Sequence, residues 1–353
     1  MKNSRKSRLH IYKTFNFWRS FMYQKKFFEI LIALSMALFF LGASNAFGAE
    51  VTLKLGTGTP KSHPQDQGAL FLADKVAKDS NGEIEIKVYH NSALGGHREL
   101  MEGMQIGTVD LYVGALSFVV PFYKKLGILE FPFLFRDLDH AWAVKHSPIG
   151  QKLQDGFYEK TGVRLMAWGG GSFQGLYTHK YQIKTLEDMK GLKMRVMDNP
   201  LRVAYMNAWG AKGTPMAFSE FYSAMEQRVV DGGENSYATY GPAKHYEVAP
   251  YFTESYHVHM PTGIFISGNT YDNLSSEHKK IMDKAFEACD RATAEFWKKA
   301  QLKYKEKAVQ NGAQIYTLPQ EEKERFEKAV QPVYKEFADD FGGMDLIKEI
   351  KDM

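Results

Sequence analysis

The chain of 353 residues carries 45 Lys and Arg against 41 Asp and Glu, a formal net charge of +4, and one cysteine. Residues 1–29 hold eight of the basic side chains and one acid, so the remainder has 37 basic and 40 acidic residues and a net charge of −3. This balance removes the main support for nucleic-acid binding, which needs a basic patch on the folded domain. The 44% hydrophobic content is ordinary for a soluble protein, and the length favours two domains.

The basic start leads into twelve apolar residues, Ile30–Leu41, and then into small residues, Gly42–Ala46. As a helix the apolar run is about 18 Å long, too short for a bilayer core of about 30 Å. We therefore expect residues 1–48 to be a cleaved secretory signal peptide and the mature protein to be periplasmic, with an uncleaved signal anchor as the alternative. Met22 starts a leader of ordinary length and is the expected true initiator.

Strand and helix patterns alternate along the rest of the chain. Strict alternation of apolar and polar residues predicts a strand at 83–89, and apolar residues at helical spacing predict a helix at 67–78. The other predicted strands are 51–55, 110–115, 163–168, 193–197, 251–259 and 263–267, and the other predicted helices are 97–106 and 138–160. This order favours an α/β fold of two lobes, each a mostly parallel sheet flanked by helices.

Residues 275–310 follow the pattern of one long helix, with Asn311 and Gly312 as a stop signal. At about 1.5 Å per residue this helix reaches about 50 Å, more than one lobe is wide, so we expect it to span both lobes. Two shorter helices are the alternative. The predicted division is lobe I at 49–172 and 261–300, and lobe II at 173–260 and 301–353.

Residues with metal-binding or nucleophilic chemistry are few and isolated. Cys289 has helical spacing with apolar residues, which indicates a buried thiol. His245, His257 and His259 lie close in sequence, but no third ligand at metal spacing is obvious, so no metal is expected. Dinucleotide fingerprints, P-loops and nucleophile elbows do not occur in the sequence, and no cofactor is expected.

Two segments contain charged residues that could act in binding or catalysis. Asp231 and Glu234 flank two glycines in a predicted flexible turn, where they suit either general acid–base catalysis or simple exposure to solvent. Arg195 lies inside an otherwise apolar strand. Because a guanidinium keeps its charge, burying it requires an acid partner, which either the protein or a ligand carboxylate supplies. The residues alone leave both options open.

Several blocks along the whole mature chain carry a recognisable pattern: Arg98–Leu111, Leu126–Asp137, Leu186–Val196, Thr214–Gln227 and Val230–Asn235. Together and in this order they resemble the solute-binding subunits of TRAP transporters, the DctP type. The resemblance implies a two-lobe periplasmic receptor that closes on an organic anion and delivers it to a membrane permease driven by an ion gradient. It also implies that Arg195 pairs with the ligand carboxylate, that Asn235 supplies an amide, and that Phe218 supplies an aromatic wall.

Departures from the family pattern bear on the substrate. Gln174 stands where many relatives have a second basic residue. It is expected to donate a hydrogen bond to the ligand but supplies no charge, which weakens the expectation of a dicarboxylate. Sialate-binding relatives have a glutamate at the position of Ala115 and an asparagine at that of Asp198, so sialate is disfavoured. Asp198 is expected to position the guanidinium or to bind sugar hydroxyls. His63 and Ser117 are expected to meet the ligand from the first lobe.

The predicted function is therefore an extracytoplasmic receptor for a C4-dicarboxylate, a sugar acid or another hydroxylated monocarboxylate. The expected partners are this small anion and the permease, without nucleic acid, and the expected state is a monomer. Two alternatives remain from the sequence. One is a secreted hydrolase or lyase that uses Asp231 and Glu234, and the other is a sensor partner that presents its ligand to a membrane receptor.

Overall fold

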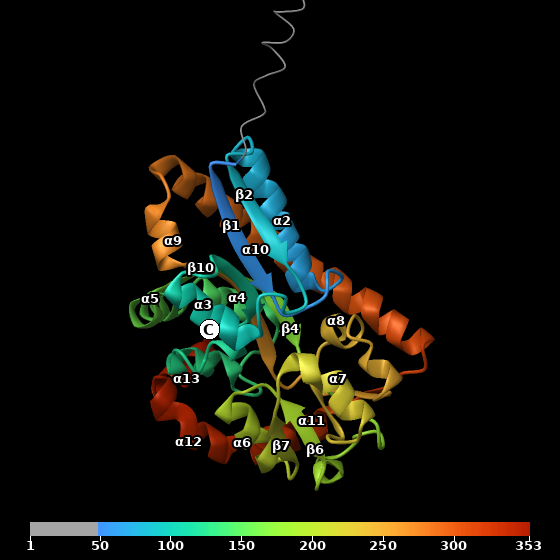
Figure 1. Ribbon diagram of the computed structural model, residues 1–353. Coiled ribbons are helices and arrows are strands. Elements are labelled where there is room, and N and C mark those ends of the chain that lie inside the picture. Colours follow the sequence, from blue (N-terminus) through green and yellow to red (C-terminus); the bar gives the residue numbers. More distant parts are fainter. Residues whose placement is uncertain (1–48) are drawn as a thin grey trace, which may run out of the picture. The chain divides into compact units, whose positions relative to one another are not determined.

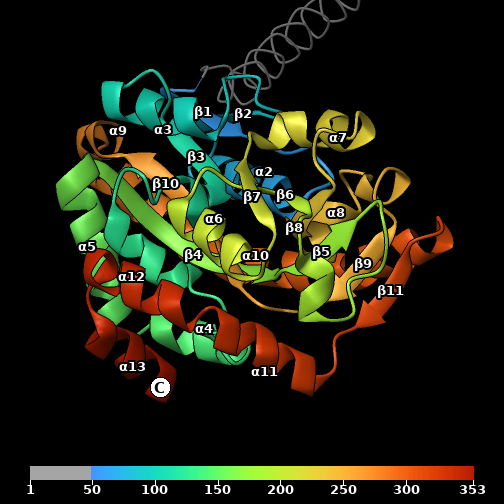
Figure 2. The ribbon, with the colours of Figure 1, turned by 90° about the horizontal axis from the view of Figure 1, so that it is seen from below.

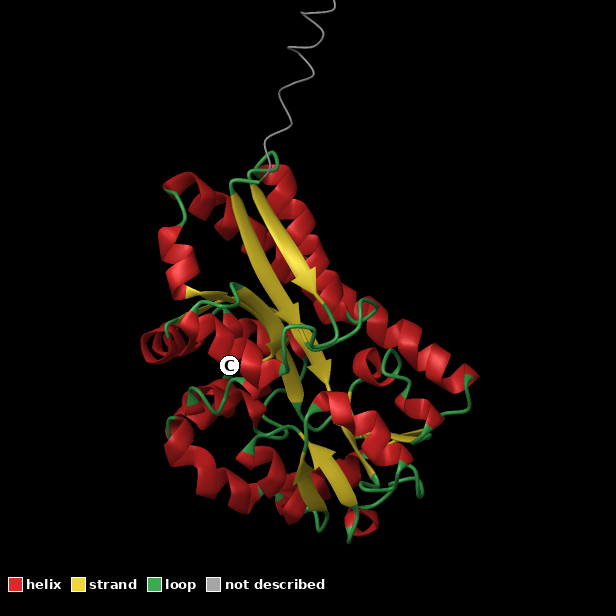
Figure 3. Ribbon diagram, viewed as in Figure 1, coloured by secondary structure: helices red, strands yellow, loops and turns green. Residues whose placement is uncertain are grey.

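Two β-sheets organise the protein, whose computed structural model describes residues 49–353 (Figures 1 and 3). The predicted signal peptide and the proposed start at Met22 lie outside these residues. The first sheet has the order β2-β1-β3-β10-β4 and the second the order β11-β9-β5-β8-β6-β7. The strands of the first sheet are β1 (Val51–Thr57), β2 (Ile84–Tyr89), β3 (Leu111–Ala115), β4 (Val163–Phe173) and β10 (His259–Ser267). Those of the second are β5 (Gly175–Thr178), β6 (Lys193–Val196), β7 (Lys212–Pro215), β8 (Gly232–Asn235), β9 (Tyr251–Glu254) and β11 (Gln314–Thr317).

Each sheet is parallel except for one strand. In the first sheet β1 pairs in parallel with β2 and β3, while β10 runs antiparallel to β3 and β4. In the second sheet β5 runs antiparallel to β8 and β9, and the other pairs are parallel. The predicted fold class, two mostly parallel sheets flanked by helices, is confirmed.

The chain crosses between the sheets through two short segments and one helix. β4 ends at Phe173 and β5 begins at Gly175, so only Gln174 separates them. β9 ends at Glu254 and β10 begins at His259, so the prediction of one strand over 251–259 is wrong. Tyr256, in the middle of that segment, has a φ of 49°, a left-handed conformation that a strand residue does not adopt. We call residues 174 and 255–258 the hinge segments.

Helices cover both sheets, as Figure 2 shows from below. Their bounds are α2 (Pro64–Asp79), α3 (His97–Ile106), α4 (Leu138–Lys145), α5 (Pro148–Thr161), α6 (Pro200–Ala208), α7 (Phe218–Glu226), α8 (Tyr237–Tyr240), α9 (Gly268–Asn273), α10 (Ser276–Gln310), α11 (Gln320–Ala329), α12 (Gln331–Phe341) and α13 (Met344–Asp352). The 3₁₀ helices are η2 (Leu116–Phe118), η3 (Lys124–Glu130), η4 (Leu186–Met189) and η5 (His245–Glu247).

The long helix is confirmed as a single element, α10. The side chain of Ser275 caps its N-terminus by accepting a hydrogen bond from the amide of His278, and Asn311 follows its last residue. α10 packs against α2 and β4 of the first lobe and against α8 of the second (Figure 1). It therefore braces both lobes, as its length predicted.

The predicted helix over 138–160 is wrong, because the chain forms two helices there, α4 and α5. Ser147 caps α5 by accepting hydrogen bonds from the amides of Ile149 and Gly150. Pro148 occupies the first helical position, where its missing N–H costs nothing, but it has no N–H to continue α4.

The last helix, α13, contacts the first lobe. His140 in α4 lies 2.7 Å from the carbonyl oxygen of Ile350, and Arg136 donates a 2.8 Å hydrogen bond to the carbonyl of Lys351. The predicted division assigned residues 301–353 to the second lobe. The structure differs, since α13 packs on α4 and the predicted boundary at 300 falls inside α10.

Cys289 lies in α10 and is fully buried, with Sγ 3.2 Å from the carbonyl oxygen of Gly68. This burial confirms the prediction of a buried thiol, and it raises the pKa of the thiol to about 12. Among the described helices, none combines the length and the apolar character that a membrane crossing requires.

Gly171, beside the first hinge segment, yields a prediction. Its φ is 138°, and a Cβ there would lie 2.3 Å from the carbonyl oxygen of Met260 on the neighbouring strand. We expect Gly171→Ala to lower the free energy of unfolding by more than 2 kcal/mol, because left-handed strain of about 1 kcal/mol adds to the backbone clash. Urea unfolding measures the loss.

The matched control is Gly162→Ala. Gly162 also has a positive φ, 70°, but a Cβ there meets nothing within 4 Å. The control carries the conformational cost alone, about 1 kcal/mol. Equal losses in the two variants would contradict the backbone clash at Gly171.

Candidate ligand-binding site

A small cavity lies between the lobes, where the carboxyl ends of parallel strands from both sheets meet. Its volume is about 20 Å³, room for about one water molecule. The residues that line it are Thr59, His63, Gln65, His97, Ala115, Phe118, Arg195, Met197, Phe218, Asn235, Thr239 and Met260. Binding sites of open α/β sheets form at this edge.

Arg195 is the charged residue of this cavity. It lies in β6 and is 1% exposed, and its Nε and Nη2 donate hydrogen bonds of 3.0 and 2.8 Å to the carbonyl oxygen of Met216. No carboxylate among residues 49–353 forms a salt bridge with it, because the buried carboxylates of Glu130 and Glu234 pair with Arg202 instead. The internal ion pair, one of the two options left open by the sequence, is therefore absent from the described residues.

The guanidinium of Arg195 keeps one edge for another acceptor. The carbonyl of Met216 occupies the edge formed by Nε and Nη2, which leaves the edge formed by Nη1 and Nη2. That edge presents two parallel N–H groups, the geometry that a carboxylate accepts. Burial lowers the pKa of Arg195 to about 10, so it remains a cation at neutral pH.

Two histidines in the cavity are neutral. Nδ1 of His63 accepts a hydrogen bond from the amide of Gln65, so its Nε2 carries the proton and donates to the hydroxyl of Thr239 at 3.0 Å. That bond joins the N-cap of α2 in the first lobe to α8 of the second. His97 stacks on Phe118 with ring centroids 3.8 Å apart. Burial lowers the pKa of both histidines to about 3, so Arg195 alone contributes full charge.

Asn235 is held in place by an aromatic cluster behind the cavity. Its Nδ2 donates a 3.1 Å hydrogen bond to the hydroxyl of Tyr177, whose oxygen lies 2.8 Å from Nδ1 of His245. Phe221 packs edge-on against His245 and also lies under Arg195, 5.0 Å from the guanidinium carbon. The amide and the guanidinium are therefore positioned by the same cluster.

The structure brings four of the seven predicted site residues together around the cavity: Arg195, Asn235, Phe218 and His63. The other three lie elsewhere. Ser117 accepts a hydrogen bond from Arg202, and Gln174 lies buried in the first hinge segment. Asp198 is exposed in a separate surface hollow.

Sequence reasoning missed the remaining polar residues of the cavity. Thr59 and Gln65 follow β1, and His97 begins α3. A usable signal was present for Thr59, since it lies in the loop that follows the predicted strand 51–55 and so near the edge where ligands bind. Thr239 carried no such signal, because α8 lies far from α2 in sequence and meets it only after the lobes pack.

Behind the cavity, a fully buried ion cluster links η3 to α6, β8 and the second hinge segment. We call Glu130, Arg202, Tyr205, Glu234 and His257 the hinge network. Arg202 donates from Nε to Glu130 at 2.9 Å and from Nη1 to Glu234 at 2.5 Å. Tyr205 and His257 reach Glu234 at 2.7 and 2.8 Å. Burial opposes the charge of Glu234, but Arg202 and these hydrogen bonds hold its pKa at about 2.

The prediction that Asp231 and Glu234 lie in a flexible turn is wrong. Residues 232–235 form β8, between β5 and β6 of the second sheet. Asp231 accepts a hydrogen bond from the amide of Lys193 and lies 2.9 Å from Nζ of Lys180. Both carboxylates are occupied by partners within the protein, and neither lines the cavity.

The three histidines considered as metal ligands, His245, His257 and His259, each contact different residues. His245 contacts Tyr177, and His257 contacts Glu234. His259 lies between Phe135 and Phe173.

The chain matches a known family along most of its length. Residues 55–340 match the family described as bacterial extracellular solute-binding protein, family 7, or DctP. A TRAP periplasmic solute-binding protein from Pseudomonas putida F1 with bound D-glucuronate is similar, with 29% identity, coverage of 86% of this chain and 97% of that chain, and a TM-score of 0.81.

Two further relatives have the same extent of similarity. A TRAP periplasmic solute-binding protein from Polaromonas sp. JS666 bound to D-erythronate is 31% identical, with coverage of 85% of this chain and 98% of that chain and a TM-score of 0.81. The sialic acid-binding periplasmic protein SiaP of Vibrio cholerae is 29% identical over 310 residues, 88% of this chain and 95% of that protein.

The hinge network yields a stability prediction. We expect Arg202→Met to lower the free energy of unfolding by about 3–5 kcal/mol, because it leaves two carboxylates buried without their cation. The control is Arg325→Met, which removes an exposed arginine that pairs with Glu187 and Glu322 and should cost much less stability, because solvent screens such pairs. Chemical unfolding of both variants tests this, and similar losses would contradict the proposed role of burial.

The buried histidines yield a pH prediction. Burial lowers the pKa of His63, His97 and His245 to about 3, whereas an unfolded histidine titrates near 6.5. Below about pH 6.5 the unfolded chain therefore binds more protons than the folded protein. As the pH is lowered from about 6.5 to about 3, the free energy of unfolding decreases by up to about 1.4 kcal/mol per pH unit for each histidine.

Urea unfolding between pH 7.5 and pH 5 measures this slope. His245→Phe, in the aromatic cluster, should reduce this slope by the contribution of one histidine, because the unfolded variant binds about one proton fewer. A stability that does not change over this range would show that the histidines are protonated in the folded protein.

Proposed function

The chain belongs to the DctP family of bacterial extracellular solute-binding proteins, and from this premise we propose that it captures a hydroxylated monocarboxylate, of the sugar-acid type, for a TRAP transporter. In this proposal the protein is exported by a cleaved signal peptide and delivers its ligand to a membrane permease. The observation that carries the proposal is the buried guanidinium of Arg195, which has no carboxylate partner among residues 49–353 and keeps a free bidentate edge.

The charge of the cavity favours one carboxylate over two. Arg195 is a cation, while His63 and His97 are neutral because burial lowers the pKa of each to about 3. A second carboxylate would enter a buried site without a second cation, and burying an unpaired charge is costly. A C4-dicarboxylate, one of the classes predicted from the sequence, is therefore disfavoured in this proposal.

The uncharged polar groups favour hydroxyls on the rest of the ligand. Thr59, Gln65 and Thr239 come from different elements and face the same cavity, with Asn235 beside Arg195. Hydroxyl and amide groups both donate and accept hydrogen bonds, which suits a polyol. The apolar lining, Phe118, Met197, Phe218 and Met260, suits the carbon faces. The relatives with bound D-glucuronate and D-erythronate agree with this class.

Closure of the lobes is the proposed binding step. The cavity of about 20 Å³ is smaller than a sugar acid, so the lobes move apart to admit the ligand. The hydrogen bond between His63 and Thr239 crosses from one lobe to the other and closes the cavity. A ligand that touches both lobes stabilises the closed arrangement, because it makes all its contacts only there.

Ligand identification tests the substrate class. We expect uronates and aldonates to raise the melting temperature with concentration, and an aldarate of the same carbon number, which adds a second carboxylate, to raise it less. Recovery of the ligand unchanged after incubation supports a receptor, whereas a product would support the secreted hydrolase or lyase. A stronger shift with the aldarate would contradict the single-carboxylate proposal.

Substitution of Arg195 tests the carboxylate clamp. We expect Arg195→Ala to weaken binding of the best ligand at least 100-fold, since a desolvated, charge-assisted pair is lost. Arg195→Lys should also weaken it, because an ammonium lacks the planar fork. Calorimetry measures both affinities. The folded stability of the alanine variant should be equal to or above that of the parent, since a buried unpaired charge is removed, and an unchanged affinity would refute the clamp.

A further inference from the structure

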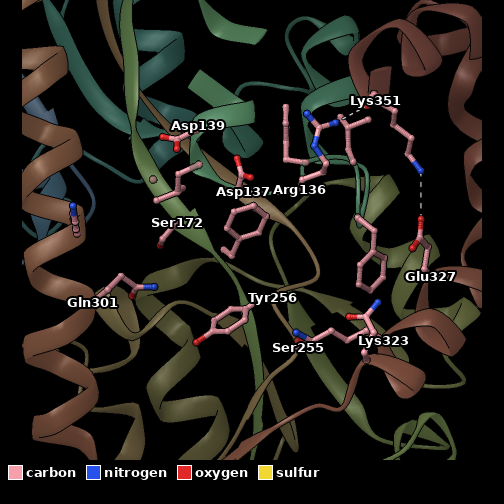
Figure 4. Close-up of a pocket in the computed structure, with 18 residues that line it drawn as sticks. Arg136, Asp137, Asp139, Ser172, Ser255, Tyr256, Gln301, Lys323, Glu327 and Lys351 are labelled. Carbon is pink, nitrogen blue, oxygen red and sulfur yellow. Dashed lines mark hydrogen bonds and ion pairs between the residues drawn. The ribbon is translucent and has the colours of Figure 1, made fainter. Parts of the chain in front are cut away.

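The ligand cavity and the large hollow at the hinge differ in the charge of their walls. Figure 4 shows the hollow, with a volume of about 950 Å³, and charges of both signs around it, among them Asp137, Lys323 and the pair of Lys351 with Glu327. Of the described residues that line the ligand cavity, Arg195 alone carries full charge. Selection among carboxylates in the cavity therefore depends on which neutral group donates a hydrogen bond and which one accepts.

A buried carboxylate lies behind the wall of the ligand cavity. Asp66, in α2, is fully buried, and both of its oxygens accept hydrogen bonds. Oδ1 accepts from the hydroxyl of Thr57 at 2.7 Å and from Nδ1 of His90. Oδ2 accepts from the hydroxyl of Thr59. Thr59 lines the cavity, whereas Asp66 does not, so any effect of Asp66 on a ligand passes through Thr59.

The surroundings of Asp66 suit the ionised form. Two hydroxyl groups and one ring nitrogen converge on its two oxygens, and a carboxylate accepts from all three without a hydrogen of its own. Burial raises the pKa of Asp66, whereas the hydrogen bonds from Thr59, His90 and Thr57 lower it and so limit the rise. Asp66 is therefore a carboxylate at neutral pH.

The hydroxyl of Thr59 has a single hydrogen, and Asp66 accepts it. The amide oxygen of Gln65 lies farther from the same hydroxyl, at 3.4 Å, and a charged acceptor forms the stronger hydrogen bond. With its hydrogen engaged, the oxygen of Thr59 offers only lone pairs to the cavity. Thr239 of the other lobe is the reverse case, because it accepts from Nε2 of His63 and keeps its own hydrogen free to donate.

We propose that Asp66 is a positioning residue that makes Thr59 a hydrogen-bond acceptor, so that the ligand must present a donor hydroxyl to Thr59. The inference rests on the proposed function and narrows its substrate class to acids with a hydroxyl at this point. A ketone, an ether or a second carboxylate there would place lone pairs against those of Thr59, and such ligands are disfavoured.

Fluorinated ligands test the proposal, because fluorine is close to a hydroxyl in size but cannot donate a hydrogen bond. The probes are D-gluconate, D-glucuronate and their deoxyfluoro forms, each with one hydroxyl replaced, and calorimetry at pH 7.5 gives the dissociation constants. We expect one position at which fluorine weakens binding to the parent protein about tenfold or more. Thr59→Val should bring that ratio close to one and leave the ratios at other positions within twofold.

Asp66→Asn tests the role of the carboxylate. Because Oδ1 accepts from two donors, the amide oxygen should take its place, and the NH₂ group should then face Thr59. Thr59 would accept from this group and turn its own hydrogen toward the cavity. The effect of fluorine at the Thr59 position should therefore fall to that in Thr59→Val. In a Thr59→Val background, Asp66→Asn should change the ratio no further, which a merely structural role does not predict.

The matched control is Asp231→Asn, the same change at another buried carboxylate, which pairs with Lys180 and does not line the cavity. Its ratios should lie within twofold of the parent, and the circular dichroism of each variant should match. An unchanged ratio in Asp66→Asn would overturn the role of Asp66. If that variant does not fold, Thr59→Val decides, since parental ratios at every position would overturn the proposal. A parent that binds neither D-gluconate nor D-glucuronate would refute the proposed function, and this inference with it.

Discussion

The unpaired guanidinium of Arg195 is the constraint around which the ligand cavity is arranged. A buried cation with no acid partner among residues 49–353 is costly, and this protein supports it with one backbone carbonyl, two aromatic rings and neutral polar neighbours. None of these cancels the charge. The guanidinium can therefore still form an ion pair with a ligand carboxylate. Only the part of that interaction free energy that exceeds the desolvation cost of both charges appears as affinity.

A second buried arginine, Arg202, has the opposite environment. It is fully paired with Glu130 and Glu234, and the cluster extends through His257 into the second hinge segment. The hinge network therefore fixes the base of the cavity without competing for a ligand. Because Glu234 is committed to Arg202, it is not free to neutralise Arg195. The pairing of one arginine keeps the other unpaired.

Strong local periodicity allowed much of the fold to be predicted. The strand at 83–89, the helix at 97–106 and the long helix near 276–310 follow from side-chain patterns, and their ends follow from caps and glycines. Errors arose where one residue overrides the pattern. Pro148 divides a helical stretch, and Tyr256 turns the chain out of the second sheet. β8 was missed because its two glycines indicate a turn, whereas neighbouring strands on both sides hold them in the sheet.

The cavity could be predicted only in part, because its residues converge from both lobes. Resemblance to the family pointed to Arg195, Asn235 and Phe218, which lie in one lobe, whereas Thr59, Gln65 and His97 come from the other lobe and meet them where the two lobes pack. The net charge of −3 after residue 29 also shows that the binding of an anion cannot be predicted from overall charge. Long-range attraction of an anion by the whole protein is absent, so selection depends on a local cation and on the neutral groups around it. In the proposed function the neutral histidines strengthen that selection, because they add hydrogen-bonding capacity without supplying a partner for a second negative charge.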